Sequence, residues 1–100
     1  MFEIEQTEVY KRWFAKLRDE AAKARVDMRI RRLRMGNAGD ARSIGRSVSE
    51  LRIDYGSGYR VYFMRKDQIV IMLLAGGDKR SQFRDIRLAL ELAQAIRSEK

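Results

Sequence analysis

Cysteine, histidine and proline are all absent from this chain of 100 residues. Without cysteine the chain has no disulfides and no thiolate metal sites, which is consistent with a cytoplasmic location. Without histidine it lacks the usual general base near neutral pH and every zinc site that uses histidine ligands. Without proline nothing interrupts its helices. We therefore expect no metal and no cofactor, and acid–base chemistry would have to come from lysine, tyrosine or a carboxylate.

Long apolar runs are missing as well, and the longest is too short to span a bilayer. The N-terminus carries Glu3 and Glu5 and shows no signal-peptide pattern. What the chain has in excess is positive charge, with 22 Lys and Arg against 14 Asp and Glu, a net charge of +8. This charge favours an acidic partner, such as nucleic acid or an acidic protein. A membrane surface is disfavoured because the apolar stripes are needed for the core. The length fits one domain over residues 1–100.

The stretch from Val48 to Lys79 has the strongest pattern, and it predicts three consecutive strands. Residues 50–55 and 59–64 have a two-residue period that places apolar residues on one face, which is typical of half-buried strands. The glycines of Gly56–Gly58 predict a three-residue hairpin loop, which would place Asp54 opposite Arg60. The third run, 68–75, is apolar without alternation, so we expect it to lie inside the sheet.

Helices are predicted on both sides of this stretch. After a short strand over 2–6, Thr7 and Asp19 are suitable N-caps for two helices with apolar stripes. Gly36 suits the end of the second helix, residues 37–47 read as a loop, and Asp78 or Ser81 can cap a last helix. The order predicts an α+β fold: an antiparallel sheet of the short N-terminal strand plus a three-strand meander, packed against an N-terminal helical hairpin and a C-terminal helix. We expect the three helices to share the apolar face of the sheet and to leave the other face partly open.

Several segments together resemble a known family. They are GNAGD at 36–40, ELRI at 50–53, GYRVYF at 58–63 and GGDKRSQFRDI at 76–86. Their combination and order resemble the RelE/ParE superfamily of toxins, and within it the HigB-like, phage-derived "addiction module killer" group. The resemblance covers nearly the whole chain.

The resemblance implies the toxin of a type II toxin–antitoxin system, which acts in the cytoplasm and is held inactive by an antitoxin protein, usually of the helix-turn-helix type. RelE-like members cut messenger RNA at the ribosome, which would make this chain an mRNA endoribonuclease that needs no metal. ParE-like members inhibit DNA gyrase by binding and cut no RNA. A third alternative is a basic module that only binds nucleic acid. Fold resemblance does not decide between them.

Metal-free RNA cleavage needs a deprotonated 2′-hydroxyl, a proton for the leaving oxygen and positive charge on the phosphorane. On the expected open face, Arg52 and Arg60 are the candidates for holding the phosphate. Lys79 or Tyr62 would handle a proton, and Tyr62 could instead stack on a base.

Asp78 and Asp85 are candidates for orienting these groups. The residues predicted to contact RNA phosphates, or an acidic segment of the antitoxin, are Lys23, Arg29, Arg32 and Arg46. Each assignment has a simpler alternative: the arginines pair with Glu50 and Asp54 across the hairpin, Tyr62 only packs, and Gly76–Lys79 is a strand-to-helix turn.

Overall fold

The computed structural model describes residues 1–99 and confirms the α+β class. Three α-helices and one short 3-10 turn join the strands of a single five-stranded sheet. In chain order the elements are β1 (Glu3–Gln6), α1 (Glu8–Lys16), α2 (Glu20–Arg34), β2 (Ala41–Gly45), β3 (Val48–Ile53), β4 (Tyr59–Arg65), β5 (Val70–Gly77), η1 (Lys79–Ser81) and α3 (Gln82–Ser98).

The helix ends follow the predicted caps. Thr7 accepts a hydrogen bond from the Tyr10 amide (3.0 Å), and its hydroxyl donates to the Leu74 carbonyl (2.6 Å), which ties α1 to β5. Asp19 accepts from two amides at the start of α2. Gly36, at φ 94°, ends α2 in the left-handed conformation that favours glycine.

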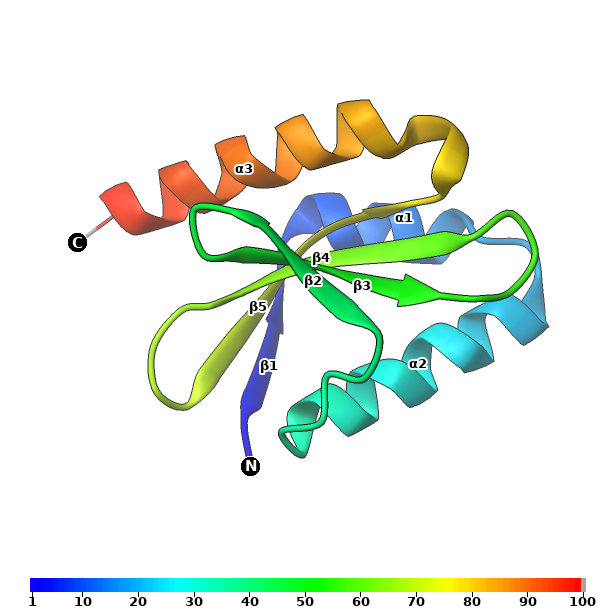
Figure 1. Cartoon of the computed structure of the whole chain (residues 1–100), viewed down its shortest axis with the longest axis horizontal. Helices are drawn as coiled ribbons and strands as arrows, with labels where there is room; N and C mark the ends of the chain where they lie inside the picture. Colours follow the sequence, from blue (N-terminus) through cyan, green and yellow to red (C-terminus); the bar gives the residue numbers. More distant parts are fainter. Residues whose placement is uncertain (100) are drawn as a thin grey trace.

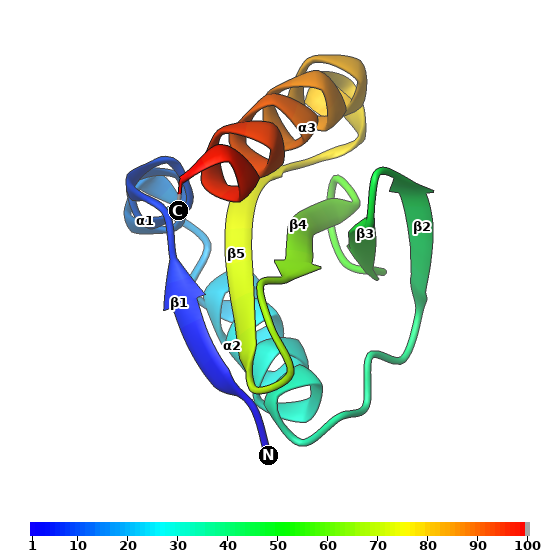
Figure 2. The ribbon, with the colours of Figure 1, turned by 90° about the vertical axis from the view of Figure 1, so that its left-hand side faces the viewer.

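The sheet is mixed, which corrects the prediction of an antiparallel sheet. Its order is β1-β5-β4-β3-β2, and β1 runs parallel to β5 while all other neighbours are antiparallel. The N-terminal strand enters beside β5, at the far edge from β2 (Figure 2). As predicted, β5 is an inner strand with neighbours on both sides.

Residues 41–45 form an edge strand, β2, whereas the sequence predicted a loop over 37–47. The segment is rich in turn formers, and its burial is slight because it pairs only with β3. The turn that follows uses positive φ at Gly45, Arg46 and Ser47. Pairing with β3, rather than local preference, makes this segment a strand.

The predicted register of the β3–β4 hairpin is wrong. Arg52 lies opposite Arg60 and Glu50 lies opposite Tyr62, so the connection covers five residues, 54–58, instead of three. Tyr55 lies in this connection, where its hydroxyl donates to Asp19 Oδ2 (3.1 Å) at the start of α2. The alternation itself is confirmed, since the two faces carry the predicted residues.

Helices cover both faces of the sheet, which corrects the expectation of one open face. Tyr10 of α1 and Val26 of α2 share a core with β3, β4 and β5 on one side. Ala89 and Ala93 of α3 pack on Tyr62, Met64 and Leu74 on the other. Figure 1 shows α2 and α3 on opposite sides of the strands. The inner strands are apolar on both faces, so both faces need cover. None of the helices within residues 1–99 is long and apolar enough to cross a membrane.

Candidate functional site

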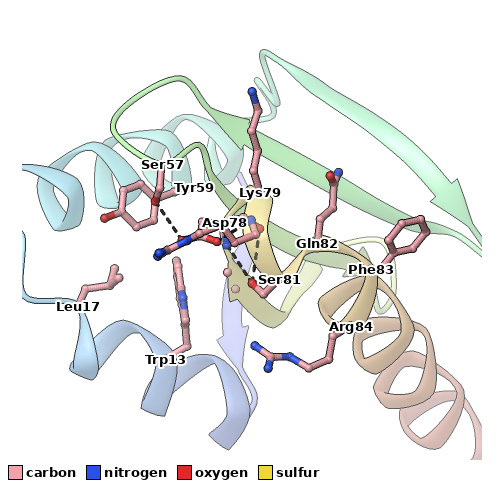
Figure 3. Close-up of a pocket in the computed structure, with 13 residues that line it drawn as sticks. Trp13, Leu17, Ser57, Tyr59, Asp78, Lys79, Ser81, Gln82, Phe83 and Arg84 are labelled. Atoms are coloured by element: carbon pink, nitrogen blue, oxygen red, sulfur yellow. Dashed lines mark hydrogen bonds and ion pairs between the residues drawn. The ribbon is translucent and has the colours of Figure 1, made fainter.

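Four of the predicted site residues converge at one end of the sheet, where β3 and β5 end and β4 begins: Arg52, Arg60, Asp78 and Lys79. Two adjoining hollows lie there. The first, which we call the basic hollow, has a volume of about 630 Å³ and is lined by Arg52, Arg60, Lys79 and Arg80, with Asp40 and Asp54 at its wall. The second, the aromatic hollow, has a volume of about 880 Å³ and includes Trp13, Leu17 and Tyr59 (Figure 3). Ser57, Lys79 and Arg80 line both, so the two hollows adjoin.

Arg60 is the most constrained cation of the site. It is only 8% exposed, and its Nη1 lies 3.7 Å from Oε1 of the fully buried Glu50. Its Nε is buried and has no hydrogen-bond partner within residues 1–99. The predicted pairing of Arg60 with Glu50 is therefore present, but it is buried instead of solvated. Because a buried charge needs a partner, Glu50 fixes where the Arg60 guanidinium lies.

Glu50 is the centre of a buried polar network that joins three strands to α3. Its carboxylate accepts hydrogen bonds from Gln82 Nε2 (2.8 Å), Arg42 Nε (3.1 Å) and the Tyr62 hydroxyl (3.1 Å). Burial raises the pKa of Glu50, but the three hydrogen bonds and Arg60 outweigh it, so that the pKa lies below its ordinary value. The carboxylate is therefore charged at neutral pH and balances Arg60.

Tyr62 lies beneath α3 and is completely buried. Burial, followed by the charge of Glu50, raises the pKa of its hydroxyl, which makes it a poor proton carrier at neutral pH. A buried ring has no face to offer a nucleotide. The geometry therefore argues against the proton-transfer and stacking roles predicted for Tyr62 and favours the simpler packing role, in which its hydroxyl supports Glu50.

Arg52 is half-exposed and pairs with Asp40, whose Oδ1 accepts from its Nη2 (2.8 Å) and Nε (3.2 Å). Arg29 holds this arrangement in place from α2. Its guanidinium donates to the carbonyls of Arg52 (2.5 Å), Ala38 (3.0 Å) and Asp40 (3.3 Å). Desolvation lowers the pKa of Arg29. With its donors committed to backbone, Arg29 is suited to bracing the loop before β2 rather than to the phosphate contact predicted for it.

The Gly76–Gly77 pair makes room for one side chain on each face of the sheet. A Cβ on Gly76 would overlap the Trp13 ring, and one on Gly77 would overlap the Asp85 carboxylate. Asp85 is 5% exposed and accepts from the Ser81 hydroxyl (2.5 Å). Through Ser81 it holds the turn that carries Lys79 and Arg80.

Asp78 begins that turn, and the predicted strand-to-helix corner is confirmed. Its carboxylate accepts from the Arg80 amide (2.9 Å), the Arg80 side chain (3.0 Å) and the Ser57 hydroxyl (3.0 Å). Burial raises the pKa of Asp78, but these bonds outweigh it, and the net pKa is below its ordinary value. The aliphatic part of the Lys79 side chain packs against Gly58. A Cβ added to Gly58 would lie 3.1 Å from Lys79 Cγ. Its ammonium pairs with no carboxylate among residues 1–99.

The other predicted phosphate-binding residues do not join this site. Lys23 lies over the Phe14 ring (5.5 Å), and Arg32 is exposed on α2, where it contacts Met28. Arg46 lies in the turn between β2 and β3, where its carbonyl accepts from Arg97. In the part of the chain from Met1 to Glu99, no three acidic side chains gather in a way that could hold a metal ion.

Among known proteins, no protein-family model matches the chain, and no solved structure matches it. An uncharacterized protein of Haemophilus influenzae is 44% identical over 94 residues, which are 94% of this chain and 95% of the relative. The chain belongs to the family of this Haemophilus protein. The name of this relative states no activity, so we infer the function from the site.

Sequence reasoning missed three parts of the site in this member of the family. Arg80 follows Lys79 directly, and its place in the GDKR segment was the available signal. For Glu50 the sequence predicts only a surface ion pair, because its burial depends on α3 crossing that face. Trp13 and Tyr59 belong to the apolar stripe of the first helix and to an alternating strand, patterns typical of core residues, and only the fold shows that both border a hollow.

Proposed function

We propose that this protein is the toxin of a type II toxin–antitoxin system and cuts messenger RNA at the ribosome. The observation that carries the proposal is the convergence of Arg52, Arg60, Lys79 and Arg80 on one hollow. These cations come from β3, β4 and the turn after β5, so that strand geometry presets their spacing. Preorganised positive charge is what a phosphoryl transition state requires. The motif resemblance to RelE/ParE toxins supports the same reading.

The cleavage step can be written with the residues of the basic hollow. The 2′-oxygen attacks the adjacent phosphorus, a 2′,3′-cyclic phosphate forms and the 5′-oxygen leaves. Arg60 and Arg52 stabilise the charge on the phosphorane, and the Lys79 ammonium donates a proton to the leaving oxygen. Asp54 lines the hollow and has no ion-pair partner among residues 1–99, so it is our candidate for accepting the 2′-proton.

The proposal includes an antitoxin partner and action in the cytoplasm. The net charge of +8 suits both RNA and an acidic antitoxin segment. A helix-turn-helix antitoxin that covered the basic hollow would block the same cations that bind RNA.

The test is to induce the protein in bacteria and to follow translation, message integrity and the DNA damage response. We expect translational arrest with cuts in translated messages. Lys79→Ala is the first variant, because the lysine lies at the surface and its removal leaves no buried charge. Removing one such cation lowers the cleavage rate by about 100-fold. Lys66→Ala, in the turn at the opposite end of the sheet, is the matched control and should cut normally.

Arg60 needs a gentler substitution, because Arg60→Ala leaves the buried Glu50 carboxylate without its charge partner. Arg60→Lys keeps the charge and removes the guanidinium, so abolished cleavage with retained folding assigns the role to the guanidinium. A DNA damage response with intact messages would overturn RNA cleavage in favour of gyrase inhibition. If induction causes neither message cleavage nor a DNA damage response, the toxin proposal as a whole is overturned.

A further inference from the structure

The aromatic hollow has a firm wall built from the Trp13 indole. One side of the ring lies against Gly76, where an added Cβ would overlap the ring at Cε3. Tyr10 holds the ring from within the core, with 5.6 Å between ring centroids. Figure 3 shows Trp13 and Leu17 next to each other on the α1 side of the hollow, with Tyr59 above them. The glycine therefore fixes an aromatic ring at the border of an open space.

Trp13, Leu17 and Tyr59 are each only partly buried, whereas their neighbour Tyr10 is 2% exposed. Tyr59 is held by stacking on Tyr55, with 6.4 Å between centroids and 19° between planes. The wall is thus both rigid and accessible, which lowers the entropy cost when a flat ligand binds.

Cations border this apolar space. Lys79 and Arg80 line both the aromatic hollow and the basic hollow. The Arg84 side chain, which is 81% exposed, lines the aromatic hollow but not the basic hollow. A flat aromatic group joined to an anion fits such a surface, and a nucleotide is that combination.

We propose that the aromatic hollow binds one nucleobase of single-stranded RNA while the neighbouring phosphate lies in the basic hollow. This inference rests on the proposed function and gives the substrate its orientation. Tyr59 and Trp13 then supply the stacking surface that Tyr62, buried under α3, cannot supply. The base enters from the solvent side, and Lys79 and Arg80 contact the phosphates that flank it.

Trp13 is the only tryptophan, so its fluorescence reports directly on this hollow. The probe is a short single-stranded RNA with a non-cleavable 2′-deoxy linkage, compared with the same oligonucleotide carrying one abasic position. The intact RNA should quench Trp13 emission, and an abasic unit next to the bound phosphate should bind about 5- to 100-fold more weakly. The inference is overturned if the intact RNA and the RNAs with an abasic unit at each position bind with equal affinity and the intact RNA does not quench Trp13 emission.

Tyr59→Leu tests the stacking surface, because leucine fills space without an aromatic face. We expect it to weaken binding of the intact RNA about 5-fold or more and to leave the affinity for the abasic RNA unchanged. Ile69→Ala, an exposed apolar residue at the opposite turn, is the matched control and should have no effect. Thermal unfolding of each variant shows whether weaker binding comes from the missing ring or from a destabilised fold.

The outcomes distinguish this inference from the function beneath it. Cleavage of messages with no base effect refutes the nucleobase site and leaves the endoribonuclease standing. No binding to any RNA, together with intact messages in the induced cells, refutes both. Quenching of Trp13 by an acidic peptide but not by RNA overturns the inference in favour of a protein occupant.

Discussion

Two adjacent glycines at the end of β5 determine how closely two helices approach the sheet. Gly76 faces Trp13 of α1, and Gly77 faces Asp85 of α3. Neither has a positive φ, so backbone conformation does not demand glycine there. Glycine is required at both positions for a steric reason, because a methyl group on either residue would overlap the side chain that packs against it.

Gly76→Ala and Gly77→Ala should each destabilise the protein by about 1–3 kcal/mol, because the side chains opposite must shift. Urea unfolding measures the effect. Each variant is the control for the other: Gly76→Ala should change Trp13 fluorescence in the folded state, while Gly77→Ala should not, because Asp85 lies on the other face. Equal fluorescence changes would contradict the assignment of the two glycines to opposite faces.

Glu50 links stability to pH. Its folded-state pKa lies below the ordinary value of 4.5, so its stabilising contribution is complete above that pH and is lost as the pH falls below it. Glu50→Gln should cost about 3–5 kcal/mol at neutral pH, since Arg60 and Arg42 lose their charge partner. The difference from the wild type should narrow as Glu50 becomes protonated in acid.

Unfolding free energies measured by urea titration across the acid range check this linkage. Glu91→Gln, an exposed change of the same chemistry on α3, is the control and should leave the pH dependence as in the wild type. A gap between Glu50→Gln and the wild type that stays constant down to acid pH would contradict the linkage.

At the residue scale, the sequence identified the cations but not their supports. Arg52 and Arg60 could be named because periodicity places them on the face opposite the apolar residues of their strands, and Lys79 because it comes just past the end of a strand. Glu50 has the same periodicity and yet is fully buried. Its burial depends on Gln82 and α3, which lie more than thirty residues away in the chain, and no local pattern encodes that contact.

At the scale of elements, the segment between α2 and β2 depends on one side chain. Arg29 reaches from α2 to the carbonyls of Ala38, Asp40 and Arg52, so it joins helix, loop and strand. Asp40 in turn pairs with the Arg52 guanidinium. The position of Arg52 in the basic hollow is therefore coupled to the loop.

Arg29→Lys should free this segment, because an ammonium cannot reach three divergent carbonyls. We expect faster amide exchange at Gly39 and Arg52 and a decrease of about 1.5–3 kcal/mol in stability. Hydrogen exchange followed by mass spectrometry measures it. Arg32→Lys, on the exposed side of the same helix, should exchange like the wild type; equal effects would show that Arg29 is not the brace.

Elements with their own signals were predictable, and elements made by pairing were not. The caps at Thr7, Asp19 and Gly36 are local, and all three are confirmed. The strand β2 has few apolar residues and exists through hydrogen bonds to β3. The hairpin register was not predictable from local signals either: Tyr55 lies in the loop, where its hydroxyl contacts Asp19, a residue far away in sequence.

At the scale of the molecule, the sequence prediction was wrong about how many faces of the sheet are covered by helices. The sequence predicts one open face, but α3 closes that face over Tyr62, Met64 and Leu74. The non-alternating apolar run in β5 already indicated burial on both faces. The consequence for function is that the basic site lies at the end of the sheet, at the strand termini, instead of on its face.

The distribution of charge leads to the last prediction. A net charge of +8 attracts RNA to the whole surface, so binding alone does not identify a site. Removing a cation that neutralises one phosphate of a single strand lowers the slope of log affinity against log salt by about 0.7. Lys79→Gln and Arg80→Gln should each show this reduction in salt-titrated RNA binding. Lys66→Gln removes the same charge at the other end of the sheet and should leave the slope unchanged. If all three variants lower the slope equally, RNA is held by diffuse charge and the basic hollow is not its site.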